Sequence, residues 1–279
     1  MDIPYQRWYP VIAGRHSRRR YDSTRPIPPE VLADLQKACD NFRPFPGARA
    51  QLITETPDKI FNLVLGAYGF IRGAPMALAF IGNVNDPHAQ EAVGYTGEGL
   101  VLEATSLGLS TCWVAGFFRP AVVAKFIKLS PGEKVPAVSP LGYSTRSRTF
   151  GERMASGFVR SRRRNPLSAL TTGLPESAWP GWVKTVLEAA RLSPSAANRQ
   201  PWRFQIEANA ITISTAGRGL GGGVSKRLDC GIAMLHLEVS ALYHGIRGVW
   251  ELLEAPQVAR FIFEKSLSDG ATVPGSGSI

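Results

Sequence analysis

The stretch Arg191–Phe204 reads R-L-S-P-S-A-A-N-R-Q-P-W-R-F and lies between a helical pattern and a strand pattern. Pro194 ends the helix, because proline cannot donate to the helical hydrogen-bond ladder and pushes the preceding residue out of the α region. Ser195 and Asn198 then place small polar groups between alanines, where a flat ligand has room to approach the backbone. The stretch is therefore typical either of a capped surface turn or of a ligand-binding loop.

Helical and strand patterns alternate on both sides of this stretch. Apolar residues repeating about every 3.6 positions predict helices, and short β-branched or aromatic runs predict strands. The predicted helices cover residues 29–40, 60–71, 89–107, 120–127, 182–191 and 229–244. The predicted strands cover residues 51–54, 76–81, 111–114, 136–142, 202–206, 210–214, 245–250 and 258–263. This alternation predicts an α+β protein in which helices pack over mixed β-sheets.

Two of the predicted helices, 89–107 and 229–244, resemble each other. Each is strongly apolar and is followed by a glycine and a short strand, with the sequences G-L-S-T-C-W-V and G-I-R-G-V-W. Gly94, Gly97 and Gly99 lie in the first helix and allow another backbone to pack closely against it. The repeat predicts a pseudo-twofold molecule in which the two helices cross at the centre.

The repeat divides the chain into three segments. Residues 1–150 form a first half, which begins with a short aromatic arm at residues 1–10, and residues 181–279 form a second half that carries the S-P-S-A-A-N loop. Residues 151–180 mix glycine, proline and serine with the basic cluster Arg160–Arg164 and show no sustained periodicity. This composition predicts a connection between the halves.

The composition indicates a soluble globular protein with an anionic partner. Of the 279 residues, 44% are hydrophobic, which suffices for a large core, and no charged or low-complexity run indicates disorder. The formal net charge of +10 favours a nucleic acid, a membrane surface, or a phosphorylated cofactor or substrate as the partner. The sign of the charge does not choose among them.

Cysteine usage and the N-terminus favour the cytoplasm. Cys39, Cys112 and Cys230 have no C-x-x-C pair and no histidine at metal-ligand spacing, so neither a disulfide framework nor a zinc site is predicted. Cys112 is interpreted as a small buried hydrophobic residue. The N-terminus lacks the apolar core of a signal peptide. The most membrane-like run, Phe61–Gly82, is interrupted by Arg72 and is interpreted as a helix followed by a strand.

A cationic arm near the N-terminus reads R-H-S-R-R over Arg15–Arg19. In an extended conformation Arg15, Ser17 and Arg19 point to the same side. Arginine donates two parallel hydrogen bonds to a phosphate and serine adds a third, so this pattern is suited to gripping a phosphate group. A solvated basic surface, or a patch for a nucleic-acid backbone, is the alternative interpretation.

Several stretches taken together resemble the FMN-dependent nitroreductase family. Arg15–Arg19 is similar to the family's R-x-S-x-R/K phosphate arm, and Ala74-Pro75 is similar to its strand entry. Gly108–Gly116, G-L-S-T-C-W-V-A-G, is similar to the segment whose backbone N–H groups face flavin N5. Gly142-Tyr143 and the arginines after it resemble the end of the phosphate site, and Ser193–Trp202 resembles the loop that reaches the flavin of the partner subunit. Each match is weak alone, but their combination is specific.

The resemblance implies a role for each candidate site residue. The residues expected at the FMN phosphate are Arg15, Ser17, Arg146 and Arg148, with His16 beside them. Arg19 is expected near the ribityl chain or the pyrimidine edge of the flavin. The residues expected at the flavin ring are Trp113, Val114, the backbone amides of Ala115 and Gly116, and, from the second half, Pro194, Ser195, Ala196 and Asn198. No side chain is predicted to be catalytic, because the cofactor carries the hydride chemistry.

The implied activity is that of an FMN-dependent NAD(P)H oxidoreductase. Its reductant is NADH or NADPH, and its acceptor is a nitroaromatic, a quinone or a similar flat molecule. The implied partner is therefore a small molecule and not a nucleic acid or a membrane.

The order of the motifs departs from the family pattern. In the family the S-P-S-x-x-N loop follows soon after the phosphate arm, but here Arg43–Arg49 stands in that place without the serine and the asparagine. The loop lies instead in the second half, which has no phosphate arm. This order indicates two fused, half-degenerate copies, so that one chain mimics the family's dimer and holds one flavin. We expect a monomer that acts as a pseudo-dimer, and further pairing of such chains is left open.

Three other interpretations stay open at this point. Gly217–Gly222 fits G-x-G-x-x-G, but the strand before it belongs to a hairpin, which disfavours a Rossmann NAD site. His236, Glu238 and His244 share a helix without the spacing of metal ligands, which favours core or helix-surface roles. The alternatives to an oxidoreductase are a non-catalytic protein that binds FMN or another ligand, and a basic protein that binds nucleic acid.

Overall fold

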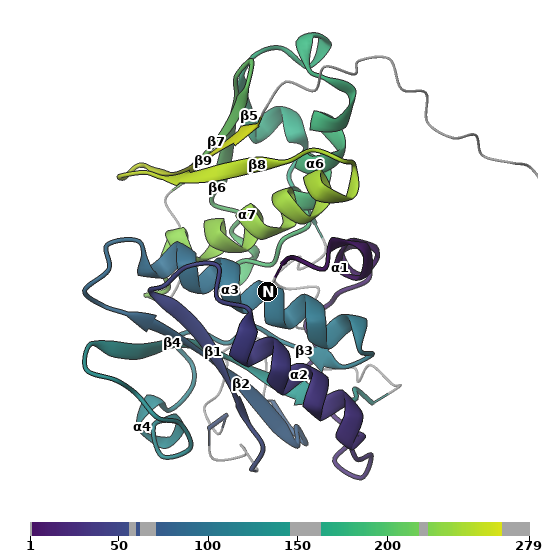
Figure 1. Ribbon diagram of the computed structural model, residues 1–279, viewed down its shortest axis with the longest axis vertical. Coiled ribbons are helices and arrows are strands. Elements are labelled where there is room, and N and C mark those ends of the chain that lie inside the picture. The colour runs from purple at the N-terminus through teal and green to yellow at the C-terminus, as the bar shows by residue number, and fades with distance from the viewer. Residues whose placement is uncertain (1, 56–59, 62–70, 146–162, 218–222, 264–279) are drawn as a thin grey trace, which may run out of the picture.

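The computed structural model describes residues 2–55, 60–61, 71–145, 163–217 and 223–263. It contains two β-sheets, one toward each end of the molecule (Figure 1). The first sheet has the strand order β1-β2-β4-β3, with the bounds Ala48–Ile53, Met76–Asn83, Glu133–Gly142 and Ser110–Thr111. The second has the order β5-β6-β7-β9-β8, with the bounds Thr171–Gly173, Trp202–Ile206, Ala210–Thr215, Gln257–Phe263 and Gly248–Leu252. Neighbouring strands are antiparallel, except that β5 and β6 are parallel.

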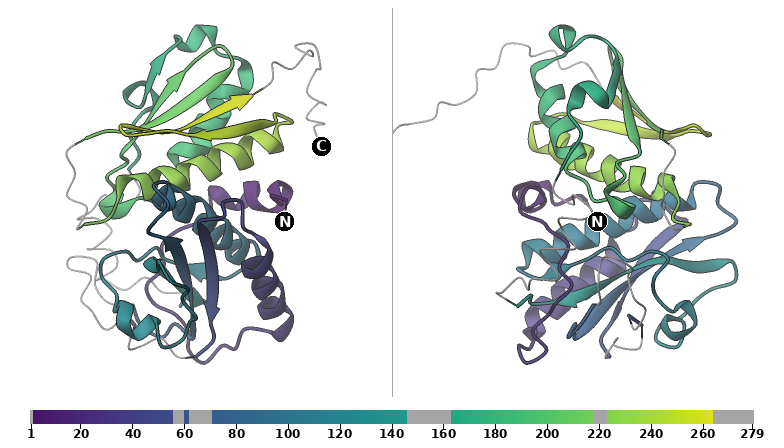
Figure 2. Two further views of the ribbon diagram at one scale, coloured as in Figure 1. Left: turned by 60° about the vertical axis from the view of Figure 1, so that its left-hand side comes forward. Right: turned by 180° about the vertical axis from the view of Figure 1, so that it is seen from behind.

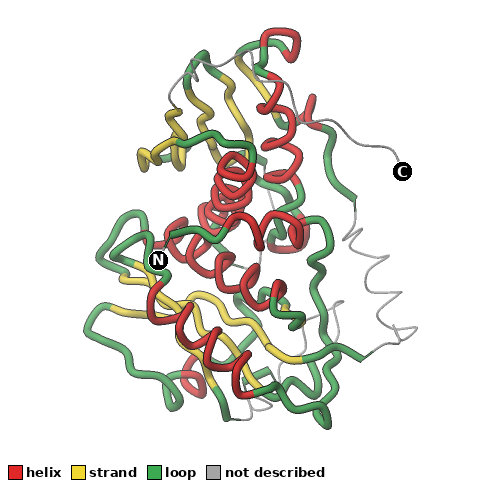
Figure 3. Tube along the Cα trace, turned by 45° about the vertical axis from the view of Figure 1, so that its right-hand side comes forward, coloured by secondary structure: helices red, strands yellow, loops and turns green. Residues whose placement is uncertain are grey.

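Helices occupy the space between the two sheets (Figure 3). The helices α3 (Ala89–Ser106) and α7 (Lys226–Tyr243) lie against each other in the middle, with α3 toward the first sheet and α7 toward the second (Figure 2). Around them lie α1 (Tyr5–Ile12), α2 (Pro29–Asn41) and α6 (Gly181–Arg191), and α4 (Pro120–Val123) lies beside the first sheet. Within the described residues, no helix combines the length and the apolar character that crossing a bilayer requires.

Strand β2 shows why the first sheet is covered on both faces. Leu78 and Phe80 belong to the main core, which includes α3, whereas Ala79 and Ile81 belong to a second apolar cluster that includes Val123 of α4. Successive strand residues point to opposite faces, so an uninterrupted apolar run places hydrophobic side chains on both. The strand predicted in this run is confirmed.

The two central helices touch through glycines. A Cβ atom on Gly94 of α3 would lie 2.0 Å from the carbonyl oxygen of Leu228, and a Cβ atom on Gly231 of α7 would lie 2.0 Å from the carbonyl oxygen of Glu91. Each glycine therefore lets the opposite backbone approach more closely than any side chain allows. Glu91 precedes Gly94, and Leu228 precedes Gly231, by about one helical turn. The contact is thus reciprocal, as a twofold axis between the helices requires.

The two halves also share their topology. Strands β1, β2, β4 and β3 occupy the same order in the first sheet as β6, β7, β9 and β8 in the second, and in each half a long central helix follows the first two of them. Both central helices end in a glycine with a φ of 80°, Gly108 and Gly245. The residue after each glycine donates its N–H back into the last turn, over 2.8 Å in the first half and 2.9 Å in the second. The predicted α+β fold with two pseudo-symmetric halves is confirmed.

The N-terminal segment differs from its prediction. Residues 1–10 are predicted to form an aromatic arm, but Tyr5–Ile12 form the helix α1. Pro10 obscures the helical pattern in the sequence, because proline lacks the N–H that this position would donate to the helical ladder. Trp8 Nε1 donates to Glu103 of α3 over 2.6 Å. The helix is thereby docked onto the centre of the molecule.

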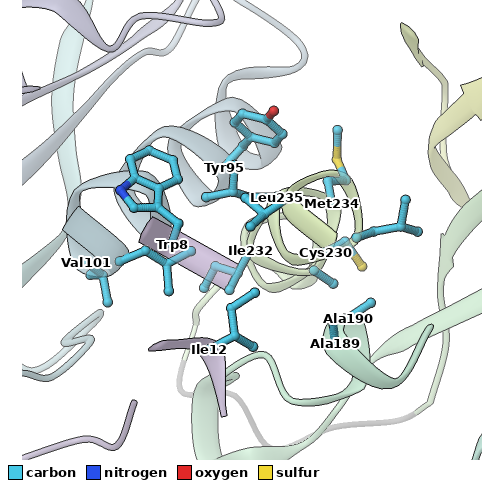
Figure 4. Packing of buried hydrophobic residues seen from close by; sticks show 14 of the residues in the cluster. Trp8, Ile12, Tyr95, Val101, Ala189, Ala190, Cys230, Ile232, Met234 and Leu235 are labelled. Atoms are coloured by element: carbon cyan, nitrogen blue, oxygen red, sulfur yellow. The ribbon is translucent and has the colours of Figure 1, made fainter. Parts of the chain in front are cut away.

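Hydrophobic contacts complete this docking. Figure 4 shows Trp8 and Ile12 of α1 among Val101 of α3 and Ile232 of α7. All four side chains are buried. Because α1 leads directly into the cationic arm, its docking between the two central helices determines where the arm begins.

Other elements differ from prediction in length. The strand predicted at 111–114 is limited to Ser110–Thr111, and the helix predicted at 120–127 is limited to Pro120–Val123. The chain leaves regular pairing at Cys112, where its N–H donates to the Ser139 hydroxyl over 3.1 Å in place of a strand partner. Most of the helix predicted at 60–71 lies outside the described residues.

The predicted connection contributes to the second sheet. Residues 171–173, from within the segment 151–180, form strand β5 and pair with β6. The part of the connection before residue 163 lies outside the described residues, and so do residues 218–222 of the glycine-rich turn. The boundaries of the two halves, at residues 150 and 181, stay predictions. Cys112, Cys39 and Cys230 are all buried and unbridged, which confirms the interpretation of Cys112.

Candidate active site

The cationic arm Arg15–Arg19 lies along the end of the first sheet. Ser17 forms a parallel bridge with Thr111 of β3, and the N–H after it donates to the Thr111 carbonyl over 2.9 Å. The carbonyl of Arg19 accepts from the N–H of Arg72, also over 2.9 Å. The arm therefore runs beside an edge strand, and these contacts hold it in an extended conformation.

Arg15 is buried where the arm meets the two central helices. It is 7% exposed, and its Nε lies 3.6 Å from Oε1 of Glu98 on α3. The same carboxylate accepts from Trp113 Nε1 over 2.6 Å and lies 2.9 Å from Nε2 of His236 on α7. Glu98 is thus a common partner of the arm, of the segment after β3 and of the second half.

His236 lies between two hydrogen-bond acceptors and is fully buried. Its Nδ1 lies 3.1 Å from the carbonyl oxygen of Ala189, which can only accept, so Nδ1 carries a hydrogen. Its Nε2 lies 2.9 Å from Oε1 of Glu98, which is the second polar partner of the ring. These contacts satisfy a carboxylate that would be costly to bury alone. The predicted core role of His236 is confirmed.

The loop Ser193–Trp202 has an uncommon backbone conformation. Three of its non-glycine residues have φ values between 48° and 53°, namely Ala197, Asn198 and Gln200. Such conformations cost roughly 1 kcal/mol or more each. They persist because the N–H of Gln200 donates to Ser195 Oγ over 3.0 Å, and its side-chain oxygen accepts from the N–H of Asn165 over 2.8 Å. The loop is therefore held in one shape by its own side chains.

Asp229, in the first turn of α7, anchors the other side of this loop. Its Oδ1 accepts from the N–H of Ala196 over 3.0 Å, and its Oδ2 accepts from Arg199 Nε over 2.7 Å. Burial raises the pKa of Asp229 to about 6, while Arg199 and the Ala196 N–H favour the charged form. At neutral pH the carboxylate is therefore mostly ionised, and the ion pair with Arg199 is present.

Arg164 connects the loop to the end of α6. Its Nη1 donates to Oδ1 of Asn198 over 2.9 Å, and its Nη2 donates to the carbonyl of Leu192 over 3.1 Å. Burial, together with the positive charges of Arg15 and Arg191, lowers the pKa of Arg164 to about 10. The arm reaches the end of α6, from which the loop begins, through a chain of contacts: Arg15 lies beside Glu98, Glu98 contacts His236, and His236 contacts the carbonyl of Ala189.

The segment after β3 faces the same region through Glu98. The indole ring of Trp113 packs on Phe80, with ring centroids 4.4 Å apart. Val114 pairs with Val138 through two backbone hydrogen bonds of 2.9 Å. The next two amides, those of Ala115 and Gly116, donate to no acceptor among the described residues.

The other predicted site residues differ in their exposure to solvent, and two of them lie outside the described residues. His16 is exposed, and Ser17, Arg19, Pro194, Ser195 and Ala196 are partly exposed. Arg146 and Arg148 lie outside the described residues, so their predicted role at the phosphate stays a prediction.

Three residues of this region are missed by sequence reasoning. Glu98 and Asp229 are acidic residues on buried helices, and a buried carboxylate signals that partners must be present. Arg164 belongs to the basic cluster that is interpreted as part of a connection. Its role depends on Asn198, which is distant in sequence, so the cluster alone gives no signal for it.

Comparison with known proteins agrees with this architecture. No curated protein matches the sequence significantly. Among solved structures, a protein of Thermotoga maritima described as a "putative nitroreductase" is 21% identical, with a TM-score of 0.60 and coverage of 91% of this chain and 93% of that chain. This likeness shows the fold.

Two smaller structures also match. A nitroreductase with bound FMN from Bacteroides fragilis is 19% identical, with a TM-score of 0.42 and coverage of 51% of this chain and 91% of that chain. A nitroreductase with bound FMN from Desulfitobacterium hafniense is 17% identical, with a TM-score of 0.43 and coverage of 53% of this chain and 92% of that chain.

The family assignment comes from the sequence itself. Residues 8–241 match the model of a family described as "Putative TM nitroreductase". The matched range contains the arm, the segment after β3, the loop, the helix α3 and most of α7. The family description denotes an oxidoreductase. The chain therefore belongs to this nitroreductase family.

Proposed function

We propose that this chain binds FMN where the arm meets the loop, and that it reduces a nitroaromatic, a quinone or a similar flat acceptor with NADH or NADPH. The main support for this proposal is that the guanidinium of Arg15 is buried with unused hydrogen-bond donors. Among the described residues, no hydrogen-bond partner exists for its buried Nε and Nη1 atoms. Its ionic partner, Glu98, already contacts Trp113 and His236. A buried guanidinium with unused donors fits a phosphate group, because two phosphate oxygens match its geometry.

The segment after β3 fits the ring end of the cofactor. When bound, FMN supplies the two-electron carrier that takes a hydride from the nicotinamide and passes it to the acceptor. We expect the amides of Ala115 and Gly116 to donate toward the ring, and Trp113 beside them is held by Glu98 and Phe80. The contribution of the chain is thus binding and orientation. No acid–base side chain is required for it.

Differences between the halves support a single cofactor per chain. In the first half the arm runs beside the edge strand β3. In the second half, residues 171–173 pair instead with β6, at the edge of the sheet opposite to β8. Within the described part of the chain, the second half therefore has no counterpart of the arm at the corresponding edge.

Aromatic side chains occupy the corresponding place near β8. Trp250 follows the glycine of its half as Trp113 does in the first, and it donates to Glu238 over 2.7 Å. Tyr95 donates to the same carboxylate, and Phe45, from the segment that replaces the loop, packs on Tyr95 with ring centroids 5.1 Å apart. We infer that the halves arose by duplication and that only one FMN site was retained.

The absorption spectrum of the purified protein tests the proposal. We expect a flavin spectrum with about one FMN per chain, which NADH or NADPH bleaches and an acceptor restores. A flavin spectrum that neither nucleotide bleaches would favour a non-catalytic FMN-binding protein. A colourless protein that does not take up added FMN, and that binds polyanions in a salt-sensitive way, would favour the nucleic-acid interpretation.

Replacing Arg15 with alanine should weaken FMN binding by roughly ten- to a hundredfold, because hydrogen bonds to charged groups contribute about 1.5–3 kcal/mol. The measurement is a fluorescence titration of the apoprotein with FMN. Arg20→Ala is the matched control, since Arg20 is exposed and directly follows the arm. An Arg15→Ala protein that is folded and binds FMN as the wild type does would contradict the phosphate assignment.

A further inference from the structure

Strand β8, at one edge of the second sheet, pairs with another strand on one side only. Its five residues pair with β9, and among the described residues no strand lies on its other side (Figure 1). The corresponding edge strand of the first sheet, β3, is covered by the cationic arm through the bridge between Ser17 and Thr111. Within the described part of the chain, the second half therefore leaves open an edge that the first half covers.

The free backbone groups of β8 follow from its pairing with β9. The N–H of Leu253 donates to the carbonyl of Val258 over 2.9 Å, so the backbone of Leu253 faces β9. In an antiparallel pair, residues alternate between facing the partner strand and facing away from it. The N–H and C=O groups of Gly248, Trp250 and Leu252 therefore face away from β9. Such a row of groups can pair with another extended chain.

The side chains of β8 divide between the two faces of the sheet. Trp250 donates to Glu238 over 2.7 Å and so points toward α7. Because successive side chains of a strand point to opposite faces, Arg247, Val249 and Glu251 point away from that helix. All three are exposed, and Val249 is 66% exposed, more than any other large hydrophobic residue among those described. An open strand edge that carries an exposed apolar residue is a template for association with another chain.

The charges of β8 complement those of a second copy in antiparallel register. A twofold axis beside Trp250 places Trp250 opposite its own copy and Val249 opposite Glu251, and it lets the outward backbone groups of the two tryptophans bond to each other. Arg247 of one chain then lies diagonally across from Glu251 of the other, within reach of long side chains, and the symmetry repeats this contact. These two attractions outnumber the single diagonal repulsion between Glu251 and its copy. Neither Arg247 nor Glu251 is in an ion pair with a described residue, so both charges are available.

We propose that two copies of this chain associate through β8, so that their second sheets join into one continuous sheet across a twofold axis. This association does not depend on FMN binding, so it stands or falls separately from the proposed function. The contact consists of one pair of short strands and is therefore a small interface. We expect a dimer with a dissociation constant on the order of 10 µM.

Sedimentation velocity of the full chain, at concentrations from about 1 to about 100 µM, tests this association. We expect the wild type to change from monomer to dimer over this range. Glu251→Lys and Arg247→Glu each replace the two attractions with repulsions, so each should raise the dissociation constant by about tenfold or more. The double variant restores two contacts between opposite charges with the signs exchanged, and it should dimerise as the wild type does.

Two controls separate association from folding and from net charge. Glu251→Lys places a lysine opposite Arg260 of β9, but the double variant contains the same lysine, so a loss of strand stability would persist in it. Glu30→Lys, at an exposed position of α2, changes the net charge by the same amount as Glu251→Lys. It should leave the dimer unchanged, because Glu30 lies in the other half of the chain.

Other results would overturn the proposal in distinguishable ways. A wild type that stays monomeric at the highest concentration would show that the edge does not pair with a copy. If a variant that ends at Phe263 then dimerises, residues 264–279 occupy the edge in the full chain. A dimer of unchanged strength in every variant would place the contact on another surface. A double variant as monomeric as the single variants would remove the contact between Arg247 and Glu251, and with it the proposed register.

Discussion

Replacing Gly94 with alanine should lower the melting temperature of this protein by roughly 4–8 °C. The new Cβ atom would lie 2.0 Å from the carbonyl oxygen of Leu228, and a backbone atom within a helix cannot move aside as the end of a side chain can. The two helices must separate, which loosens the core between them at a cost of about 3 kcal/mol or more. The better helix propensity of alanine offsets at most about 1 kcal/mol of this. For a chain of this size each kcal/mol shifts the melting temperature by about 2–4 °C.

The reciprocal contact supplies a second variant, and an open glycine supplies the control. Gly231→Ala should cost about as much as Gly94→Ala, because its Cβ atom would meet the Glu91 carbonyl at the same distance of 2.0 Å. Gly181, at the start of α6, has no atom within 4 Å of its hypothetical Cβ, so Gly181→Ala should be neutral or slightly stabilising. A thermal melt followed by circular dichroism measures all three. If Gly94→Ala has the same melting temperature as Gly181→Ala, the two central helices do not pack as described.

Replacing Glu98 with alanine should reduce the free energy of unfolding by about 3–5 kcal/mol, because removing one partner of a buried ion pair leaves the other charge uncompensated. Glu98 is completely buried, and its loss leaves Arg15, Trp113 and His236 without their common acceptor. These groups come from the arm, the segment after β3 and the second half. The loss therefore also loosens the places that we propose for FMN. Urea denaturation measures the change in stability.

An exposed ion pair provides the control for this experiment. Glu176 contacts Lys184 at 2.6 Å, but the two side chains are 57% and 62% exposed. Glu176→Ala should change the stability by less than about 1 kcal/mol, since solvent screens such pairs. Glu98→Gln retains an acceptor of the same shape and should fall between the two. Equal stability of Glu98→Ala and Glu176→Ala would show that the buried network does not hold the halves together.

Regular elements with a strong apolar period are predictable from this sequence. The helix over Ala89–Ser106 and the strand over Met76–Asn83 are long and apolar, and the structure confirms both. Helix α1 is missed, because Pro10 interrupts its local signal and its stability comes from Trp8, which contacts a helix distant in sequence. Strand β5 is missed for the same reason, since three residues are ordered only by pairing with β6. Local pattern predicts elements that local interactions favour, and tertiary contacts create the rest.

The candidate site also contains residues that the sequence predicts and residues that only the structure shows. The arm Arg15–Arg19 and the loop Ser193–Trp202 are visible in the sequence, because each depends on the order of a few neighbouring residues. Glu98 and Asp229 are not, because a carboxylate on an apolar helix shows that partners exist without showing which. Their partners, Arg15 and Arg199 among them, are known only once the chain has folded.

The amino-acid sequence by itself determined the family, the α+β class and the two motifs that lie in different halves. Only the tertiary structure decided that these motifs meet, because their meeting depends on how closely α3 and α7 approach. Gly94 and Gly231 permit that approach, and Glu98 and His236 join the two helices across it. A glycine in a sequence permits close packing of another backbone segment but does not specify which segment. The packing of the whole core selects that segment, because its close contacts are compatible with only one arrangement of the helices.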